Sequence, residues 1–136
     1  MSVTEAAGLP VRPGESAWTE EELAEVRNQL ESDIALLRKE IAEAESELAE
    51  RLADSVDGAG DDPTDTGAKA YQREHDLALA YNTRDLLAQS ERAVQRMDEG
   101  TYGECESCGQ AVGKARLQAF PRATLCVQCK QREERR

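Results

Sequence analysis

Residues 19–54 read TEEELAEVRNQLESDIALLRKEIAEAESELAERLAD, and apolar side chains recur in them at intervals of three and four residues. This spacing places the side chains on one narrow stripe of an α-helix, as in coiled coils. It predicts a helix over residues 19–54, about 50 Å long at about 1.5 Å per residue. The stripe consists of Leu23, Val26, Leu30, Ile34, Leu37, Ile41, Ala44, Leu48 and Leu52.

The beginning of this helix carries its own signals. Thr19 is a good N-cap residue, and Glu22 follows three residues later as its capping-box partner. Trp18, just before the cap, can pack on Leu23 as a hydrophobic staple. We therefore expect the helix to begin at Thr19.

Residues 54–67 end the periodicity and combine three glycines, one proline and five aspartates, which is typical of a turn region. A second helical pattern runs over residues 68–98, and its stripe is weaker than the first. A narrow stripe cannot be buried by one helix alone, so we predict a mainly α fold built on an antiparallel coiled-coil hairpin. Pairing with other chains in a parallel coiled coil is the alternative. The large apolar residues of the second stripe are Tyr71, Leu79, Leu86, Leu87, Val94 and Met97.

The charge of the chain is high and uneven. Its 136 residues include 17 Lys and Arg against 28 Asp and Glu, with 39% hydrophobic and 4% aromatic residues. So few large side chains exclude an all-β sandwich and a large enzyme fold. Residues 1–99 carry a net charge of -14 and residues 100–136 a net charge of +3. The acidic part argues against sequence-independent binding to nucleic acid, which needs Lys and Arg along the phosphates.

Two further features concern compartment and flexibility. The first residues lack the apolar run of an export signal, and the chain has no stretch near the roughly 20 apolar residues of a membrane span. We expect a soluble, cytoplasmic protein with no membrane partner. Residues 1–17 are rich in Gly, Pro and small polar residues, so we expect a flexible tail. The predicted domains are this tail, a hairpin over residues 18–98 with an acidic tip at 54–67, and a finger over 99–136.

The finger contains all four cysteines of the chain. Cys105 and Cys108 form one Cys-x2-Cys pair, and Cys126 and Cys129 form a second pair after seventeen residues. Two such pairs are typical of a structural zinc site with four thiolate ligands, which leaves no position for a catalytic water. We predict one structural Zn²⁺ and no enzymatic activity. Two disulfides and a redox-active pair are the alternatives.

Other residues complete the expected finger. Gly103 and Gly109 flank the first cysteine pair, where tight turns favour residues without a Cβ. Residues 127–136 are interpreted as a short C-terminal helix. Basic residues are frequent in this part of the chain, and we expect most of them only to solvate it.

Residues 100–109, GTYGECESCG, and residues 116–129, RLQAFPRATLCVQC, resemble the C-terminal zinc finger of the DksA/TraR family of bacterial transcription factors. The resemblance extends to the hairpin tip, where the family carries a motif of the form Asp-x-x-Asp-x-Ala. Here Asp62 and Asp65 match the two aspartates, and Gly67 stands in place of the alanine. Glycine at this position is expected to loosen the tip.

The resemblance implies a regulator that binds RNA polymerase rather than DNA, and we expect it to be a monomer. Family members insert the hairpin into the secondary channel of the polymerase and thereby change initiation, so Asp62 and Asp65 would lie near its active centre. The positions matching the family's contacts to guanosine tetraphosphate are Gln89, Phe120 and Lys130, of which only Lys130 is basic. We therefore expect little dependence on this alarmone.

Three other functions remain open from the sequence. A zinc ribbon that binds promoter DNA is consistent with the basic finger, although the acidic hairpin opposes it. A Gre-like factor that stimulates transcript cleavage also uses an acidic tip, but such factors lack this finger. A thiol oxidoreductase would need a reactive cysteine, which a zinc-bound site does not offer.

His75, the only histidine, is interpreted as a surface or stripe residue rather than a ligand or a base.

Overall fold

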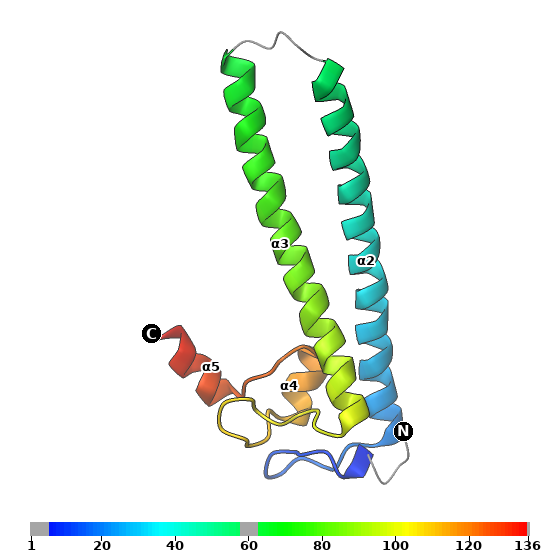
Figure 1. The fold of residues 1–136 in the computed structure, drawn as a ribbon. Helices are drawn as coiled ribbons and strands as arrows, with labels where there is room; N and C mark the ends of the chain where they lie inside the picture. Colours follow the sequence, from blue (N-terminus) through cyan, green and yellow to red (C-terminus); the bar gives the residue numbers. More distant parts are fainter. Residues whose placement is uncertain (1–5, 58–62, 136) are drawn as a thin grey trace. The chain divides into compact units, whose positions relative to one another are not determined.

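The computed structural model describes residues 6–57 and 63–135, with the side chains of residues 6–54 and 67–135. Among these residues the structure contains the helices α2 (Glu20–Asp57), α3 (Pro63–Glu99), α4 (Lys114–Ala119) and α5 (Val127–Glu134) (Figure 1). The only β pairing in this part is an isolated antiparallel bridge between Glu104 and Ala111. The predicted mainly α fold is confirmed.

The chain divides into two compact units. We call the first the base unit, which comprises Met1–Asp33 and Gln89–Arg136, and the second the arm unit, which comprises Ile34–Ala88. Each unit contains a part of α2 and a part of α3. The predicted division into tail, hairpin and finger stays a prediction.

The start of α2 has the predicted capping box. The Thr19 hydroxyl accepts a hydrogen bond from the Glu22 N–H at 3.1 Å, and the Glu22 carboxylate accepts one from the Thr19 N–H at 3.0 Å. Trp18 and Leu23 are both buried in the same core, as the hydrophobic staple requires. These bonds satisfy N–H groups that the first turn of a helix otherwise leaves unpaired.

The core of the base unit forms around the first part of the α2 stripe. Leu23, Val26 and Leu30 are buried there together with Met97 of α3. The rings of Trp18 and Tyr102 pack against each other with centroids 6.2 Å apart. Burial raises the pKa of Tyr102, whose hydroxyl donates a hydrogen bond to the Pro121 carbonyl at 2.8 Å. This core joins the two long helices to the loops of the finger.

The segment from Ala6 to Ala17, which we call the strap, packs on this core. Ala6 is 0% exposed and Leu9 is 3% exposed. Both belong to the hydrophobic cluster of the base unit. The strap has few apolar residues, and its packing partners lie far along the chain. No local sequence pattern therefore predicts that it packs on the core.

In the arm unit, α2 and α3 run antiparallel. Arg84 forms an ion pair with Glu45, and Arg51 forms one with Asp76. The partner on α3 thus moves backward along the chain as the residue on α2 moves forward, which is the register of a hairpin. The predicted pairing of the two helices is therefore confirmed.

The predicted stripe is buried only in its first part. Ile34 and Leu37 are buried, whereas Leu48 is 40% exposed and Leu52 is 53% exposed. Several large apolar side chains of α3 are also exposed, with Tyr71 at 75%, whereas Leu86 and Leu87 are half-buried. Beyond residue 40, α3 therefore gives the α2 stripe little apolar surface to pack against. The other exposed apolar residues of α3 are Leu77, Leu79 and Tyr81.

Helix boundaries differ from those predicted in two places. Helix α2 continues to Asp57, and α3 begins at Pro63, so the predicted turn over residues 54–67 is too wide. Proline is tolerated in the first turn of a helix because an N–H there has no intrahelical partner. Helix α4 was not predicted at all, although its sequence, KARLQA, consists of good helix formers.

None of the helices in residues 6–57 and 63–135 has both the length and the apolar character needed to cross a bilayer.

Candidate metal centre

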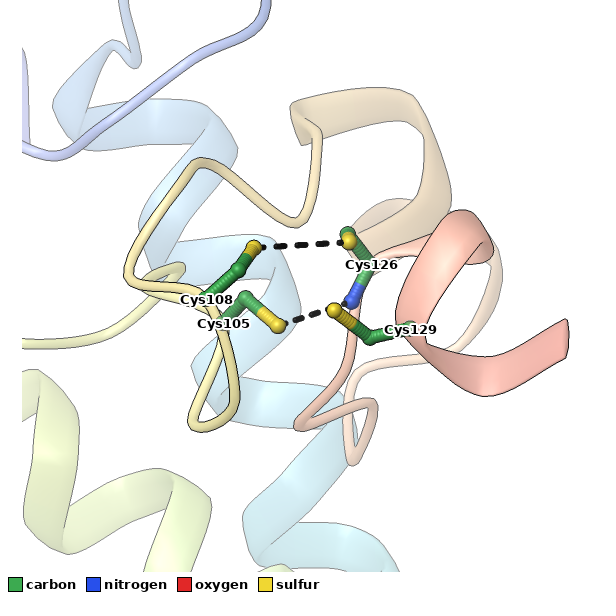
Figure 2. Close-up of side chains that lie close together, drawn as sticks. All are labelled: Cys105, Cys108, Cys126 and Cys129. Atoms are coloured by element: carbon green, nitrogen blue, oxygen red, sulfur yellow. Dashed lines mark hydrogen bonds between the residues drawn. The ribbon is translucent and has the colours of Figure 1, made fainter. Parts of the chain in front are cut away.

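The four cysteines come from two segments of the base unit. Cys105 and Cys108 lie in the loop between α3 and α4, whereas Cys126 precedes α5 and Cys129 lies in its first turn. Figure 2 shows the four side chains converging from these two segments. All four thiols are free, so the structure contains neither of the two disulfides left open by the sequence.

The distances between the sulfur atoms fit one metal ion. All four Sγ atoms lie within 4.8 Å of one another, and those of Cys108 and Cys126 are 3.8 Å apart. A tetrahedral zinc ion with Zn–S bonds of about 2.3 Å places its sulfur ligands about 3.8 Å apart. The arrangement thus needs little contraction to hold the ion. Three of the cysteines are buried, and Cys108 is exposed.

Backbone hydrogen bonds shape the loop of the first pair. The Cys105 N–H donates to the Gln110 carbonyl at 2.7 Å, and the Gly109 N–H donates to the Cys105 carbonyl at 3.0 Å. Gly103 and Gly109 have φ angles of +97° and +74°, which side chains with a Cβ rarely adopt. Both predicted glycine positions are confirmed. The Glu106 N–H reaches the Thr124 carbonyl at 2.9 Å and joins this loop to the segment before Cys126.

Hydrogen bonds also favour thiolates at two of the positions. Burial of Cys105 opposes its ionisation, but N–H groups of Cys108 and Cys126 outweigh burial and lower the pKa of its thiol to about 6. The Cys129 N–H lowers the pKa of Cys126. A bond with Ser107 lowers the pKa of Cys129, yet its bond with Cys126 and its burial dominate and raise this pKa to about 11. Thiolates are the form that binds zinc.

The metal centre is attached to α3 by two arginines. The Arg92 side chain donates to the Glu106 carboxylate at 2.7 Å. Arg96, with only 11% of its side chain exposed, donates to the carbonyls of Thr101 at 2.9 Å and Glu104 at 2.6 Å. The loop carrying the first cysteine pair is therefore fixed to the last turns of the helix.

The strap forms hydrogen bonds with the start of α4 in the finger. The Glu15 carboxylate accepts hydrogen bonds from the N–H groups of Lys114 and Ala115, both at 3.0 Å. The Lys114 ammonium is 2.7 Å from the Glu22 carboxylate and also donates to the Ser16 hydroxyl at 3.0 Å. No local sequence pattern indicates Glu15 or Lys114 as contact residues, since the bonds of Glu15 join residues about 100 positions apart.

Comparisons with known proteins identify the finger and the rest of the chain. Residues 100–135 match the family model described as the prokaryotic dksA/traR C4-type zinc finger. The chain is 31% identical over 133 residues to the RNA polymerase-binding transcription factor DksA of Escherichia coli K12, covering 96% of this chain and 85% of that protein. This chain belongs to the DksA/TraR family.

Other members of the DksA/TraR family agree with this assignment. The DksA of Caulobacter vibrioides NA1000 is 35% identical over 124 residues, which cover 88% of this chain and 70% of the relative. The solved structure of transcription factor DksA2 from Pseudomonas aeruginosa matches with a TM-score of 0.68 and 28% identity, covering 85% of each chain. The finger is accordingly a C4 zinc finger that binds one metal ion, and the protein is not an enzyme.

The predicted tip and alarmone residues lie on several elements of the chain. Asp62 lies outside the described residues, and Asp65 lies in α3, with its side chain outside them. Gly67 is an exposed residue of α3 rather than of a turn. Lys130 is exposed on α5, and its Nζ lies 3.9 Å from a carboxylate oxygen of Glu133. Phe120 is 63% exposed, and the guanidinium carbon of Arg116 lies 5.9 Å from the centre of its ring. The roles of the tip residues and of Lys130 stay predictions.

Proposed function

We propose that this protein binds RNA polymerase and regulates the initiation of transcription without catalysing a reaction. The observation that carries the proposal is the alignment with RNA polymerase-binding transcription factors over 70–85% of their length, with a four-sulfur centre in the matched finger. When bound, zinc supplies four metal–sulfur bonds that tie the two cysteine segments together. The protein's own residues then supply the contacts to the polymerase.

The proposed mode of action is insertion of the helical hairpin into the secondary channel of the polymerase. Two antiparallel helices joined by a short connection form a narrow element that can enter a channel. Asp62 and Asp65 would act there as carboxylates close to the catalytic centre, and Gly67 would modulate the tip. The acidic character of residues 1–99 supports binding to basic surfaces of a partner rather than to nucleic acid.

In vitro transcription with the cognate polymerase tests this mode of action. We expect the wild-type protein to change initiation, and the double variant Asp62→Asn, Asp65→Asn to bind the polymerase without changing initiation. A matched control is Glu43→Gln plus Glu47→Gln, which removes two exposed carboxylates from α2. Equal activity of the tip variant and the wild type would contradict the proposed role of the aspartates.

Direct binding to promoter DNA is the second candidate, and the basic finger is the feature that favours it. A DNA-binding protein should bind free duplex with a steep dependence on salt, because each neutralised phosphate releases counterions. We expect no such binding in the absence of polymerase. A Gre-like function is tested separately, since it requires the protein to stimulate transcript cleavage in stalled complexes.

We also propose a monomeric cytoplasmic protein with little dependence on guanosine tetraphosphate. Lys130 is the one basic residue at the three positions matched to the alarmone contacts, and recognition of two diphosphate groups favours several cations. The alarmone should therefore change the effect of this protein on transcription by less than about tenfold, or about 1.4 kcal/mol. The measurement requires a polymerase that lacks any other alarmone site.

A further inference from the structure

Arg132 lies next to the metal centre but was counted in the sequence only among the basic residues of the finger. Helix α5 begins directly after Cys126, and its first turn carries Cys129. Arg132 follows Cys129 by three residues, so both side chains lie on the same side of the helix. The Arg132 guanidinium donates a hydrogen bond to the Cys129 Sγ, with its Nη2 3.6 Å from the sulfur.

The negative charge of a zinc-loaded centre explains why a positively charged donor is favourable at this position. Four thiolates and one Zn²⁺ carry a net charge of -2, which must be balanced where three of the four cysteines are buried. The Cys126 N–H donates to Cys105 at 3.4 Å, and the Ser107 hydroxyl bonds to Cys129, but both of these donors are neutral. Arg132 brings a full positive charge to a ligand sulfur.

No carboxylate in the described part of the chain forms an ion pair with Arg132. The nearby Lys130 on α5 does have a carboxylate partner, because its Nζ lies 3.9 Å from Oε2 of Glu133. The guanidinium is therefore available to the sulfur, and a hydrogen bond from a charged donor is stronger than one from a neutral donor.

We propose that Arg132 is a positioning residue of the metal centre, which holds the Cys129 sulfur in place and slows the loss of zinc. The hydrogen bond orients the ligand, and the positive charge offsets part of the negative charge of the loaded centre. Partners of this kind, which contact a ligand rather than the metal, typically change metal affinity by about 10- to 100-fold. This role is independent of the proposed binding to RNA polymerase.

The test measures zinc transfer from the purified protein to an excess of the chromogenic chelator 4-(2-pyridylazo)resorcinol at neutral pH. We expect Arg132→Gln to release zinc about tenfold faster than the wild type, because the lower end of the affinity loss for such partners is about tenfold and we assign this loss to faster dissociation. Arg135→Gln is the matched control, because it makes the same change three residues later on a residue that is exposed like Arg132 but has no hydrogen bond to a cysteine sulfur in the described part of the chain. It should release zinc at the wild-type rate.

Two outcomes of the zinc-transfer measurement would overturn the proposal. If Arg132→Gln released zinc at the wild-type rate, the hydrogen bond would contribute nothing to zinc retention. If Arg132→Gln and Arg135→Gln accelerated release equally, the effect would come from net charge rather than from the contact with Cys129. Arg132→Lys keeps the charge but loses the planar donor, so its release rate should lie between those of the wild type and Arg132→Gln.

A spectroscopic measurement separates this role from a folding defect. After replacement of zinc by Co²⁺, the ligand-field bands should show four sulfur ligands in both the wild type and Arg132→Gln. The thiolate-to-cobalt charge-transfer band should shift in Arg132→Gln and not in Arg135→Gln, because only the former loses a hydrogen bond to a ligand sulfur. An unshifted band in Arg132→Gln would contradict the proposal.

Discussion

Glu15 performs a task at the start of α4 that the adjacent residue cannot perform. Gly113 occupies the N-cap position of α4 and offers no side-chain hydrogen bond. Glu15 instead accepts bonds from the first two N–H groups of the helix, at Lys114 and Ala115. The N–H of Ala115 is the largest cause of the lowered pKa of Glu15, followed by the N–H of Arg12, and burial opposes them. A capping residue supplied from so far away leaves no local motif in the sequence.

Replacing this residue tests the cap and its dependence on pH. Glu15→Gln should lower the free energy of unfolding by about 1 kcal/mol at pH 7, as the loss of a helix cap does. The pKa of Glu15 is lower in the folded than in the unfolded protein, so its contribution is present above the unfolded value near 4.5 and is lost as the pH falls through the folded value. Denaturation followed by the fluorescence of Trp18, the only tryptophan, measures the difference at each pH.

The control for this prediction is Glu104→Gln, an exposed carboxylate for which no hydrogen bond from its side chain is described. Acid also removes zinc, but this loss affects the variant and the wild type alike, so it largely cancels in the difference. A stability gap between Glu15→Gln and the wild type that stayed constant from pH 7 to pH 3 would refute the assigned cause.

At the scale of the helices, the α2 stripe has two parts with different roles. Leu30 is 0% exposed in the core of the base unit, whereas Leu48 is 40% exposed in the arm unit. Leu30→Ala should destabilise the protein by about 2–5 kcal/mol, because it removes buried methyl groups and leaves a cavity. Leu48→Ala should cost less than about 1 kcal/mol, since much of that side chain already contacts water. Urea denaturation of both variants measures the contrast, and equal costs would contradict this account of the stripe.

The helices also show what sequence patterns can predict. The spacing from Leu23 to Leu37, the capping box and each Cys-x2-Cys pair act within a few residues. The burial of this part of the stripe, the capping hydrogen bonds and the clustering of the four cysteines are confirmed. The exposure of Leu48 and Leu52 depends on the opposite helix, which the spacing on α2 alone does not reveal. The wide predicted turn had a different cause, since Asp and Gly favour turns but do not prevent the helices from reaching Asp57 and Pro63.

At the scale of the whole molecule, zinc and the helices stabilise different parts. Helices α2 and α3 contain 38 and 37 residues, whereas α5 contains 8. Removal of zinc by a chelator should therefore leave most of the ellipticity at 222 nm, because α2 and α3 contribute most of the signal and contain no cysteine. Hydrogen exchange should increase strongly between Cys105 and Cys108 and along α5. Loss of most of the helical signal on chelation would show that the long helices also depend on the metal.

The N-terminal contacts of the base unit affect how the protein folds during translation. A ribosome makes the chain from its N-terminus, so Glu15 and Trp18 emerge long before Lys114 and Tyr102, with which they pack. Arg51 and Asp76, only 25 residues apart, can meet much earlier. The α2 and α3 segments of the arm unit can thus associate during translation. The indole of Trp18 stays exposed to water until Tyr102 has been synthesised.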